Sequence, residues 1–470
     1  MGAASPREIV KNADIAIIGG GFSGTAVAAQ LLRQAKGPLR IAWIEKNAEI
    51  GRGVAYGTRS PWHLLNVPAG RMSAMPDQPG HFLEWLRARA EPKARLPETQ
   101  TPLEDQFISR MIFGQYVQEW FLDCQRAARW GVVLDRHQDE AIAFEEKKGS
   151  VQIRMKNGPP IIARRTVLAI GNPPPSELFF KPNGVKPKAY CNDPWAGDVF
   201  DLATASEPVL LIGSGLTMVD VALELGERGH RGKILAVSRH GLLPRAHQKM
   251  PPELADWSPS GQSRSLRSIF REVRGAVRSR QKEGIDWRNV INSMRPRTQA
   301  LWMEMNVREK NRFLRHLRIY WDVHRHRMPR ESGDRIEEMR RSGQFEFTAG
   351  RILELNETLS GIAVRIQPRK GPALLEYRVA RVINCTGPDL RYPASGGELI
   401  SALRASGWIT SSDAGIGIDV APAARAFLHL IGPPRIGSLW ETTAVPDIRG
   451  QAFELARELK DGGGPAYEST

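Results

Sequence analysis

Two glycine-rich segments, about 190 residues apart, constrain the fold of this chain more than any other feature. Each follows a short apolar run and precedes a run of helix-forming residues. The first reads Gly19-Gly-Gly21-Phe22-Ser23-Gly24, and the second reads Gly213-Ser-Gly215-Leu-Thr-Met218. Between a strand and a helix, such glycines permit a tight turn, let the backbone approach a pyrophosphate and allow close packing of the two elements. Two such segments predict two dinucleotide-binding units, a pairing typical of a flavin reduced by a nicotinamide.

The first segment has the features of an FAD site. Unpaired N–H groups at the start of the following helix would hold the phosphates. The next predicted strand, residues 39–45, ends in Glu45, about 20 residues past the glycines, where a ribose-binding carboxylate is expected. We therefore interpret Gly19, Gly21, Phe22, Ser23, Gly24 and Glu45 as residues that bind FAD.

The second segment differs in two ways. Met218 stands in place of the third glycine, and the strand that follows ends in Ser238-Arg239-His240 instead of an acid. A carboxylate there would repel a 2′-phosphate, whereas an arginine can bind it. Gly213, Gly215 and Arg239 are thus predicted to bind NADPH in preference to NADH. The alternative is that Arg239 is a solvated charge on a basic surface.

The same order of predicted elements occurs twice along the chain. After each glycine segment comes a β-meander, at residues 141–155 with an Asn157-Gly158 turn and at residues 362–379. We predict an α/β fold with two Rossmann-like dinucleotide-binding domains, the FAD domain being split around the NADPH domain. The FAD domain comprises residues 1–172 and 385–470. The NADPH domain comprises residues 173–384 and includes a basic helical insertion at about residues 250–330.

The formal net charge of +15 is concentrated in this insertion, between Arg264 and Arg330. Binding to nucleic acid or to a membrane surface is one interpretation. The other is a solvated helical insertion whose field attracts an anionic substrate or NADPH. We favour the second, because basic and apolar residues alternate at helical spacing and no recognised nucleic-acid motif is present. We therefore expect a small-molecule substrate as a partner, with no nucleic acid and no membrane.

The cysteines argue against two other classes of chemistry. Cys124, Cys191 and Cys385 are far apart and form no CxxC pair, which disfavours a disulfide reductase and a cysteine metal cluster. We predict no metal site. No apolar stretch is long enough to span a bilayer, and the N-terminus lacks an apolar signal core, so a cytoplasmic enzyme is expected.

Several motifs together resemble a known family. They are residues 17–24, the segment Gly51-Arg-Gly53-Val-Ala-Tyr56-Gly57, residues 63–73, residues 430–434 and residues 440–449. In these motifs the chain resembles the YdhS-like family of bacterial FAD/NAD(P)-binding oxidoreductases. That family is similar to two-domain flavin monooxygenases, including urate hydroxylase-like and amino-acid N-oxidising members. The resemblance covers nearly the whole chain apart from the basic insertion.

The resemblance implies roles for further residues. Asn66 would lie near the reactive edge of the flavin, although an Asx turn before Val67-Pro68 is the ordinary alternative. The remaining implied flavin contacts are Gly53, Tyr56, Gly432, Ala444 and Val445. Ala444 and Val445 open a short run, ending at Asp447, that precedes a predicted helix from Ile448. The N–H groups at that helix start would point at the flavin pyrimidine, the alternative being a capped surface helix. His63 is expected to be a loop or core residue instead of a base.

The resemblance implies a monooxygenase as the leading function. NADPH would reduce FAD, and reduced FAD with dioxygen would form a C4a-hydroperoxide that hydroxylates a small anionic nitrogenous substrate. Such chemistry belongs mainly to the cofactor, and no catalytic triad or carboxylate pair stands out in the sequence. The alternatives are an NADPH-dependent flavin reductase that passes electrons to a quinone or protein acceptor, and a nucleotide-binding redox sensor.

Overall fold

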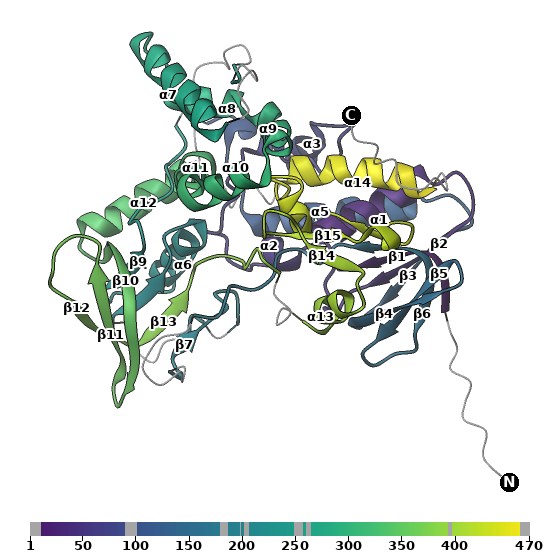
Figure 1. Cartoon of the computed structure of the whole chain (residues 1–470), viewed down its shortest axis with the longest axis horizontal. Coiled ribbons are helices and arrows are strands. Elements are labelled where there is room, and N and C mark those ends of the chain that lie inside the picture. The colour runs from purple at the N-terminus through teal and green to yellow at the C-terminus, as the bar shows by residue number, and fades with distance from the viewer. Residues whose placement is uncertain are drawn as a thin grey trace. The chain divides into compact units, whose positions relative to one another are not determined.

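The computed structural model divides the chain into two compact units (Figure 1). It describes residues 11–89, 101–178, 187–197, 199–201, 206–248, 257–259, 265–392 and 397–460. The N-terminal ten residues and the predicted start of the basic insertion near residue 250 lie outside these ranges. The first unit comprises Met1–Arg59, Val67–Pro173 and Leu390–Thr470, and the second comprises Ser60–Asn66 and Pro174–Asp389. Ser60–Asn66 therefore belongs to the second unit, although the residues on both sides of it belong to the first.

The first unit contains a mixed sheet in the order β3-β2-β1-β6-β5-β4, with β16 pairing to β6. Its strands are β1 (Lys11–Ile18), β2 (Leu39–Ile44), β3 (Val132–His137), β4 (Ala141–Lys147), β5 (Ser150–Met155), β6 (Ile161–Leu168) and β16 (Leu428–Leu430). Strands β3, β2, β1, β6 and β16 run parallel, whereas β4, β5 and β6 form an antiparallel meander. The central parallel strands are buried and rich in β-branched residues, as expected for strands covered on both faces.

The helices of the first unit come from both ends of the chain. They are α1 (Phe22–Gln34), α2 (Gly53–Tyr56), α3 (His81–Ala88), α5 (Arg110–Arg126), α13 (Glu398–Ala405) and α14 (Val445–Lys460). Helix α1 packs against α5 and against the C-terminal α14. The C-terminal segment also supplies a short hairpin, β14 (Ile409–Ser411) and β15 (Ile418–Val420), so that the two ends of the chain complete one fold.

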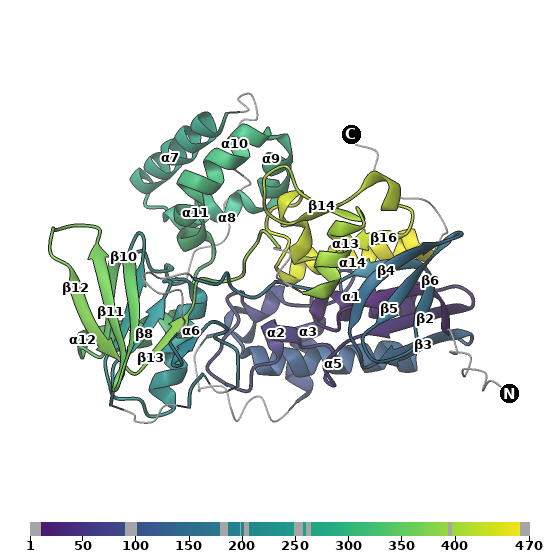
Figure 2. The same cartoon turned by 60° about the horizontal axis from the view of Figure 1, so that its bottom comes forward.

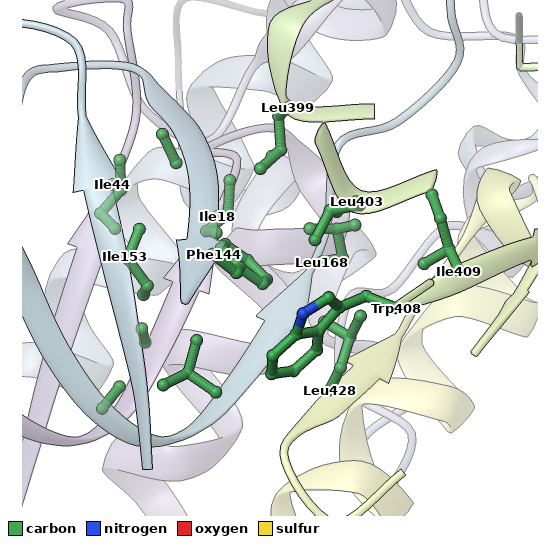
Figure 3. Close-up of a cluster of buried hydrophobic side chains, with 14 of the residues drawn as sticks. Ile18, Ile44, Phe144, Ile153, Leu168, Leu399, Leu403, Trp408, Ile409 and Leu428 are labelled. Carbon is green, nitrogen blue, oxygen red and sulfur yellow. The ribbon is translucent and has the colours of Figure 1, made fainter. Parts of the chain in front are cut away.

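One buried core joins the N-terminal sheet to the C-terminal segment (Figure 3). Ile18, Ile153 and Leu168 of the sheet pack with Leu403 and Leu428. At this contact the ring of Trp408 meets that of Phe144 edge to face, with centroids 5.8 Å apart. Burial of this apolar surface fixes the C-terminal segment to the first unit.

The second unit repeats this plan with a sheet in the order β12-β11-β10-β9-β8-β13-β7. Its strands are β7 (Tyr190–Cys191), β8 (Val209–Ile212), β9 (Ile234–Ser238), β10 (Phe345–Thr358), β11 (Gly361–Pro368), β12 (Leu375–Val379) and β13 (Arg381–Asn384). Strands β10, β9, β8, β13 and β7 are parallel, and β10, β11 and β12 form the meander. The predicted duplication of a parallel sheet with a meander is thereby confirmed.

Helices α6 (Leu216–Glu227) and α12 (Arg330–Arg341) pack together in this unit, and a group of helices lies between them in sequence (Figure 2). The group consists of α7 (Leu266–Lys282), α8 (Trp287–Ser293), α9 (Thr298–Glu304), α10 (Val307–Arg312) and α11 (Arg318–Arg325). Its small core contains Ile269, Ile291, Met294 and Leu301. The described part of the predicted basic insertion is therefore helical. None of the helices in the described ranges is both long and apolar enough to cross a membrane.

Candidate dinucleotide sites

The first glycine segment joins β1 to α1, and its glycines serve different purposes. Gly19 has a φ of 106°, and a Cβ there would lie 2.4 Å from the carbonyl oxygen of Ala169. A Cβ on Gly24 would lie 1.9 Å from the oxygen of Gly19. The protein itself thus requires Gly19 and Gly24. At Gly21, by contrast, a Cβ would meet only the Cα of Gly53, at 3.7 Å.

The open space at Gly21 fits a phosphate group. Helix α1 begins there without a side-chain cap, and its first turn carries no acidic residue. Its first N–H groups and the positive end of its dipole can therefore interact with an anion. Phe22 and Ser23 of this turn are themselves buried. The residues present in this loop fit the pyrophosphate of a dinucleotide.

Glu45, which directly follows β2, is held beside this loop. The N–H of Gly20 donates to Oε2 of Glu45, while Oε1 accepts from the backbone and side chain of Asn47 at 2.8 Å. These hydrogen bonds fix the direction of the carboxylate. Glu45 thus lies next to the glycines, and its binding to a ribose stays a prediction.

The motif around residues 51–57 closes onto the same loop. Gly53 has a φ of 54°, and a Cβ there would lie 3.0 Å from the Cα of Gly21, so the two backbones face each other. Tyr56 is buried at the end of α2, where its ring meets Phe113 at 4.7 Å and Phe22 at 6.0 Å between centroids. Burial raises the pKa of the Tyr56 hydroxyl well above its ordinary value. Tyr56 is therefore neutral and is packed within an aromatic cluster.

The C-terminal segment that the family resemblance connects with the flavin packs against helix α1. Gly432 has a φ of 74°, and a Cβ there would lie 2.5 Å from Oγ of Ser23 on α1. Ala444 precedes α14, which begins at Val445 and has Asp447 in its first turn. Sequence reasoning missed Glu441, a buried residue with a φ of 61°. A non-glycine residue in the left-handed region costs about 1–3 kcal/mol, and such strain clusters at functional sites.

The second glycine segment joins β8 to α6 and repeats the construction of the first. Gly213 has a φ of 113°, and a Cβ there would lie 2.5 Å from the carbonyl oxygen of Cys385. No atom lies within 4 Å of a Cβ placed on Gly215. Helix α6 also begins without a side-chain cap or an acidic residue. Met218, at the position of the third glycine, is fully buried in the core of this unit.

The residues after β9 form a basic corner at this second loop. Oγ of Ser214, between the two glycines, donates to Oγ of Ser238 at 2.8 Å or to the oxygen of Leu242 at 2.7 Å. Arg239 is exposed, and it makes no hydrogen bond or ion pair with the described residues. Its guanidinium is thus available to a ligand.

Sequence reasoning missed two further members of this corner, His240 and Arg369. Nη1 of Arg369 lies 2.7 Å from Nδ1 of His240. Partial burial, together with the charges of Arg369 and Arg239, lowers the pKa of His240. Neutral His240 can accept the hydrogen bond at Nδ1 and so orient the Arg369 guanidinium. Two arginines therefore belong to this corner: Arg239 follows β9, and Arg369, which follows β11, is positioned by His240.

Asn66 and His63 lie on the segment Ser60–Asn66, which packs within the second unit. The backbone oxygen of Asn66 accepts a hydrogen bond from Nε2 of His247 at 3.1 Å. Burial, followed by the charge of Arg327, lowers the pKa of His247 to about 3, so this imidazole is neutral. The main chain of Asn66 is therefore fixed, and its side chain is half-buried.

His63 belongs to a buried network that holds the same segment. Its Nε2 lies 3.9 Å from Oε2 of Glu224 on α6, and its ring meets Trp195 edge to face. Glu224 also accepts hydrogen bonds from Ser60 and, at 2.7 Å, from Arg228. Burial alone would raise the pKa of Glu224, but these hydrogen bonds and His63 hold it below its ordinary value. The described residues contain no cluster of His, Cys, Asp or Glu suited to a metal ion.

Part of this chain matches a described family and a curated relative. Residues 16–173 match a family described as FAD-NAD(P)-binding. A Baeyer–Villiger monooxygenase of Streptomyces coelicolor is 30% identical over 137 residues, which are 29% of this chain and 22% of that protein. The chain thus matches about a fifth of the length of this curated relative.

Solved structures share the fold over nearly the whole chain. An ornithine hydroxylase from Pseudomonas aeruginosa has a TM-score of 0.66 at 15% identity, covering 96% of this chain and 99% of its own. An ornithine N-hydroxylase from Kutzneria sp. 744 has a TM-score of 0.64 at 14% identity, with coverage of 96% and 99%. An FAD-bound cadaverine monooxygenase from Erwinia amylovora has a TM-score of 0.65 at 12% identity, with coverage of 98% and 97%. The chain therefore has the two-domain Rossmann-like fold of FAD- and NADP-binding flavoproteins.

Proposed function

We propose that this protein is an FAD-dependent, NADPH-using monooxygenase that hydroxylates a small nitrogenous substrate. The observation that carries the proposal is the pair of similarly built loops with different charges beside them. Gly21 and Gly215 both leave open space at an uncapped helix start, but Glu45 stands beside the first loop and Arg239 beside the second. A carboxylate suits a ribose and arginines suit a 2′-phosphate.

In this proposal each unit binds one of the two cofactors. In the first unit, the N–H groups at the start of α1 bind the FAD pyrophosphate, and Glu45 binds the adjoining ribose. In the second unit, the start of α6 binds the NADPH pyrophosphate, and Arg239 and Arg369 bind its 2′-phosphate. When bound, reduced FAD supplies the activation of dioxygen, which protein side chains cannot supply.

The overall reaction balances with the two cofactors. Substrate, dioxygen, NADPH and one proton give hydroxylated substrate, NADP⁺ and water. Asn66 is proposed as the side chain that hydrogen-bonds the flavin, because its amide can donate and accept without titrating. The N–H groups at the start of α14, from Ala444 and Val445 onward, are proposed to face the flavin pyrimidine and to stabilise negative charge on the reduced ring.

The substrate class rests on two independent arguments. Solved structures of the same fold act on ornithine and cadaverine according to their names, which favours an amine nitrogen as the reacting group. The resemblance to the YdhS-like family and the net charge of +15 favour an anionic substrate. An amino acid, which carries both an amine and a carboxylate, satisfies both arguments, and urate is the second candidate.

Isotopically labelled dioxygen provides the test. The FAD-loaded protein is mixed with NADPH and a panel of amines, amino acids and urate, and the products are analysed by mass spectrometry. We expect one substrate to accelerate NADPH oxidation and to gain one labelled oxygen atom. Electron transfer to a quinone without any labelled product would instead identify an NADPH-dependent reductase. The same assay with NADH tests the nicotinamide preference.

A further inference from the structure

The basic insertion carries most of the excess positive charge of the chain. Residues 265–330 hold 17 Arg and Lys against 6 Asp and Glu, a net charge of +11 out of the +15 of the whole chain. Many of these arginines are neutralised locally. Arg280 pairs with Glu283, Arg297 with Glu304, Arg312 with Glu309 and Arg318 with Asp322. Such pairs leave little net field of their own.

Helix α7 is different, because four of its arginines form an unpaired stripe. Arg267, Arg271, Arg274 and Arg278 recur at intervals of four, three and four residues, which places them on one helix face. All four are exposed, and none makes an ion pair or hydrogen bond with the described residues. At about 1.5 Å per residue the stripe is about 16 Å long. We call these four residues the α7 arginine stripe.

The opposite face of α7 is already occupied. Leu266 and Ile269 are buried, and Ile269 packs with Ile291 and Leu301 of the neighbouring helices. The single acid of the helix, Glu272, accepts a hydrogen bond from Ser268 at 3.4 Å. Both figures place α7 at the outer side of the group α7–α11 (Figures 1 and 2). Core packing therefore explains one face of α7 and leaves the stripe unexplained.

We propose that the α7 arginine stripe is a docking surface for an acidic helix of a partner protein. Carboxylates repeated at four, three and four residues on a facing helix would meet the four guanidiniums, and Arg binds carboxylates with two parallel hydrogen bonds. This surface lies within the second unit, and the proposal does not depend on the reaction proposed above.

Phe270 favours a protein over the other polyanions. Its side chain is 40% exposed beside the stripe, and protein interfaces characteristically combine arginine with exposed aromatic surface. The guanidinium of Arg274 covers the Phe270 ring at 5.6 Å, so that face is not open for stacking on a nucleic-acid base. An anionic membrane is disfavoured because the apolar face of α7 is buried and cannot enter the lipid.

The test uses the full FAD-loaded protein and three probes in fluorescence anisotropy. One probe is a labelled helical peptide with glutamates at four-, three- and four-residue spacing and one leucine beside them. The others are the same peptide with its residues permuted and a DNA duplex of matched charge; phosphatidylglycerol vesicles are tested by co-sedimentation. We expect the patterned peptide to bind at least about tenfold more tightly than the permuted one, because spacing and not net charge is recognised.

Matched quadruple variants locate the surface. Arg267→Gln, Arg271→Gln, Arg274→Gln and Arg278→Gln together should weaken patterned-peptide binding by about tenfold or more. The control combines Arg280→Gln, Arg297→Gln, Arg312→Gln and Arg318→Gln, which removes the same charge from ion-paired positions and should change binding less than about threefold. Circular dichroism establishes that both variants are folded.

Three results would overturn the proposal. Equal losses in both quadruple variants would mean that only the diffuse field of the insertion attracts anions. Equal binding of patterned and permuted peptides would remove the evidence for a facing helix. Tighter binding of the DNA duplex or of the vesicles than of the patterned peptide would assign the stripe to a different class of partner. A supporting control is Phe270→Ala, which should weaken peptide binding without changing its salt dependence.

Discussion

Nη1 of Arg369 and Nδ1 of His240 lie 2.7 Å apart, although 129 residues separate them in the chain. The sheet of the second unit brings them together. Ala349 of β10 pairs with Ser238 of β9, and the N–H of Arg369, just past β11, donates to the oxygen of Ala349 at 2.8 Å. An arginine only donates, so Nδ1 of His240 must accept, and the imidazole must be neutral.

This relationship predicts a role for Arg369 in nicotinamide selection. Arg369→Ala should raise the Kd for NADPH about tenfold, equivalent to about 1.4 kcal/mol, and leave that for NADH nearly unchanged. Arg239→Ala should act in the same direction. Titration with 2′,5′-ADP and with 5′-AMP measures the effect without turnover. The control is Arg378→Ala, which removes an exposed charge from the same meander. If Arg378→Ala weakened NADPH binding equally, the effect of Arg369→Ala would come from the general positive charge and not from a specific contact.

His247 predicts a specific dependence of stability on pH. Its pKa in the folded protein is about 3, lowered from 6.5 by burial and by the charges of Arg327, Arg288 and Arg325. Between these pKa values the unfolded chain binds a proton that the folded protein does not, so stability falls as the pH decreases. The slope is about 1.4 kcal/mol per pH unit, and the loss between about pH 7 and about pH 5 is up to about 2 kcal/mol.

Urea unfolding of His247→Asn checks this prediction. The variant has no imidazole to protonate, but its amide can still donate toward the oxygen of Asn66. It should lose less stability than the parent protein when the pH is lowered over that range. His316→Asn, which changes an exposed histidine, should keep the full pH dependence. Identical pH profiles for His247→Asn and the parent would mean that His247 already titrates in the folded protein.

The local parts of both sites were predictable from sequence, because their residues are neighbours along the chain. Gly19, Gly21 and Glu45 belong to one strand–helix–strand unit whose spacing follows from standard geometry. The partners that make these glycines obligatory were not predictable. The oxygen of Ala169 faces Gly19 because β6 pairs with β1, and the oxygen of Cys385 faces Gly213 because β13 pairs with β8.

Arg369 and the packing of Ser60–Asn66 were missed for a related reason. Arg369 reaches His240 through the register of three strands, one of which carries an irregularity between Ile352 and Glu354. No local pattern encodes such a register. Ser60–Asn66 joins the second unit through contacts with Glu224 and His247, both more than 150 residues away. Hydrogen bonds between residues so far apart in the chain leave no periodic pattern in the sequence.

The hydrogen bonds around Glu224 predict that removal of this one buried carboxylate lowers the stability of the folded protein. Glu224→Ala would leave the Ser60 hydroxyl without this acceptor and would remove the carboxylate 3.9 Å from Nε2 of His63, at a cost of about 1–3 kcal/mol. The unfolding free energy of the protein in urea measures this loss. Glu338→Ala, with a side chain 77% exposed, should change it by less than about 0.5 kcal/mol. Equal effects of the two substitutions would show that Ser60–Asn66 is held by other contacts.

The different surroundings of Gly19 and Gly21 predict that one substitution in this loop lowers stability and the other abolishes FAD binding. Gly21→Val introduces side-chain atoms into space that the protein leaves open, so the variant should retain no FAD but keep the thermal midpoint of the FAD-free parent protein. Gly19→Val forces a Cβ against the oxygen of Ala169 at a φ of 106°, so it should lower the midpoint whether or not FAD is present. Gly215→Val should retain FAD and lose NADPH, because only the second loop is filled. Flavin absorbance and thermal denaturation distinguish these outcomes, and a fully flavinated Gly21→Val protein would refute the assignment of FAD to the first loop.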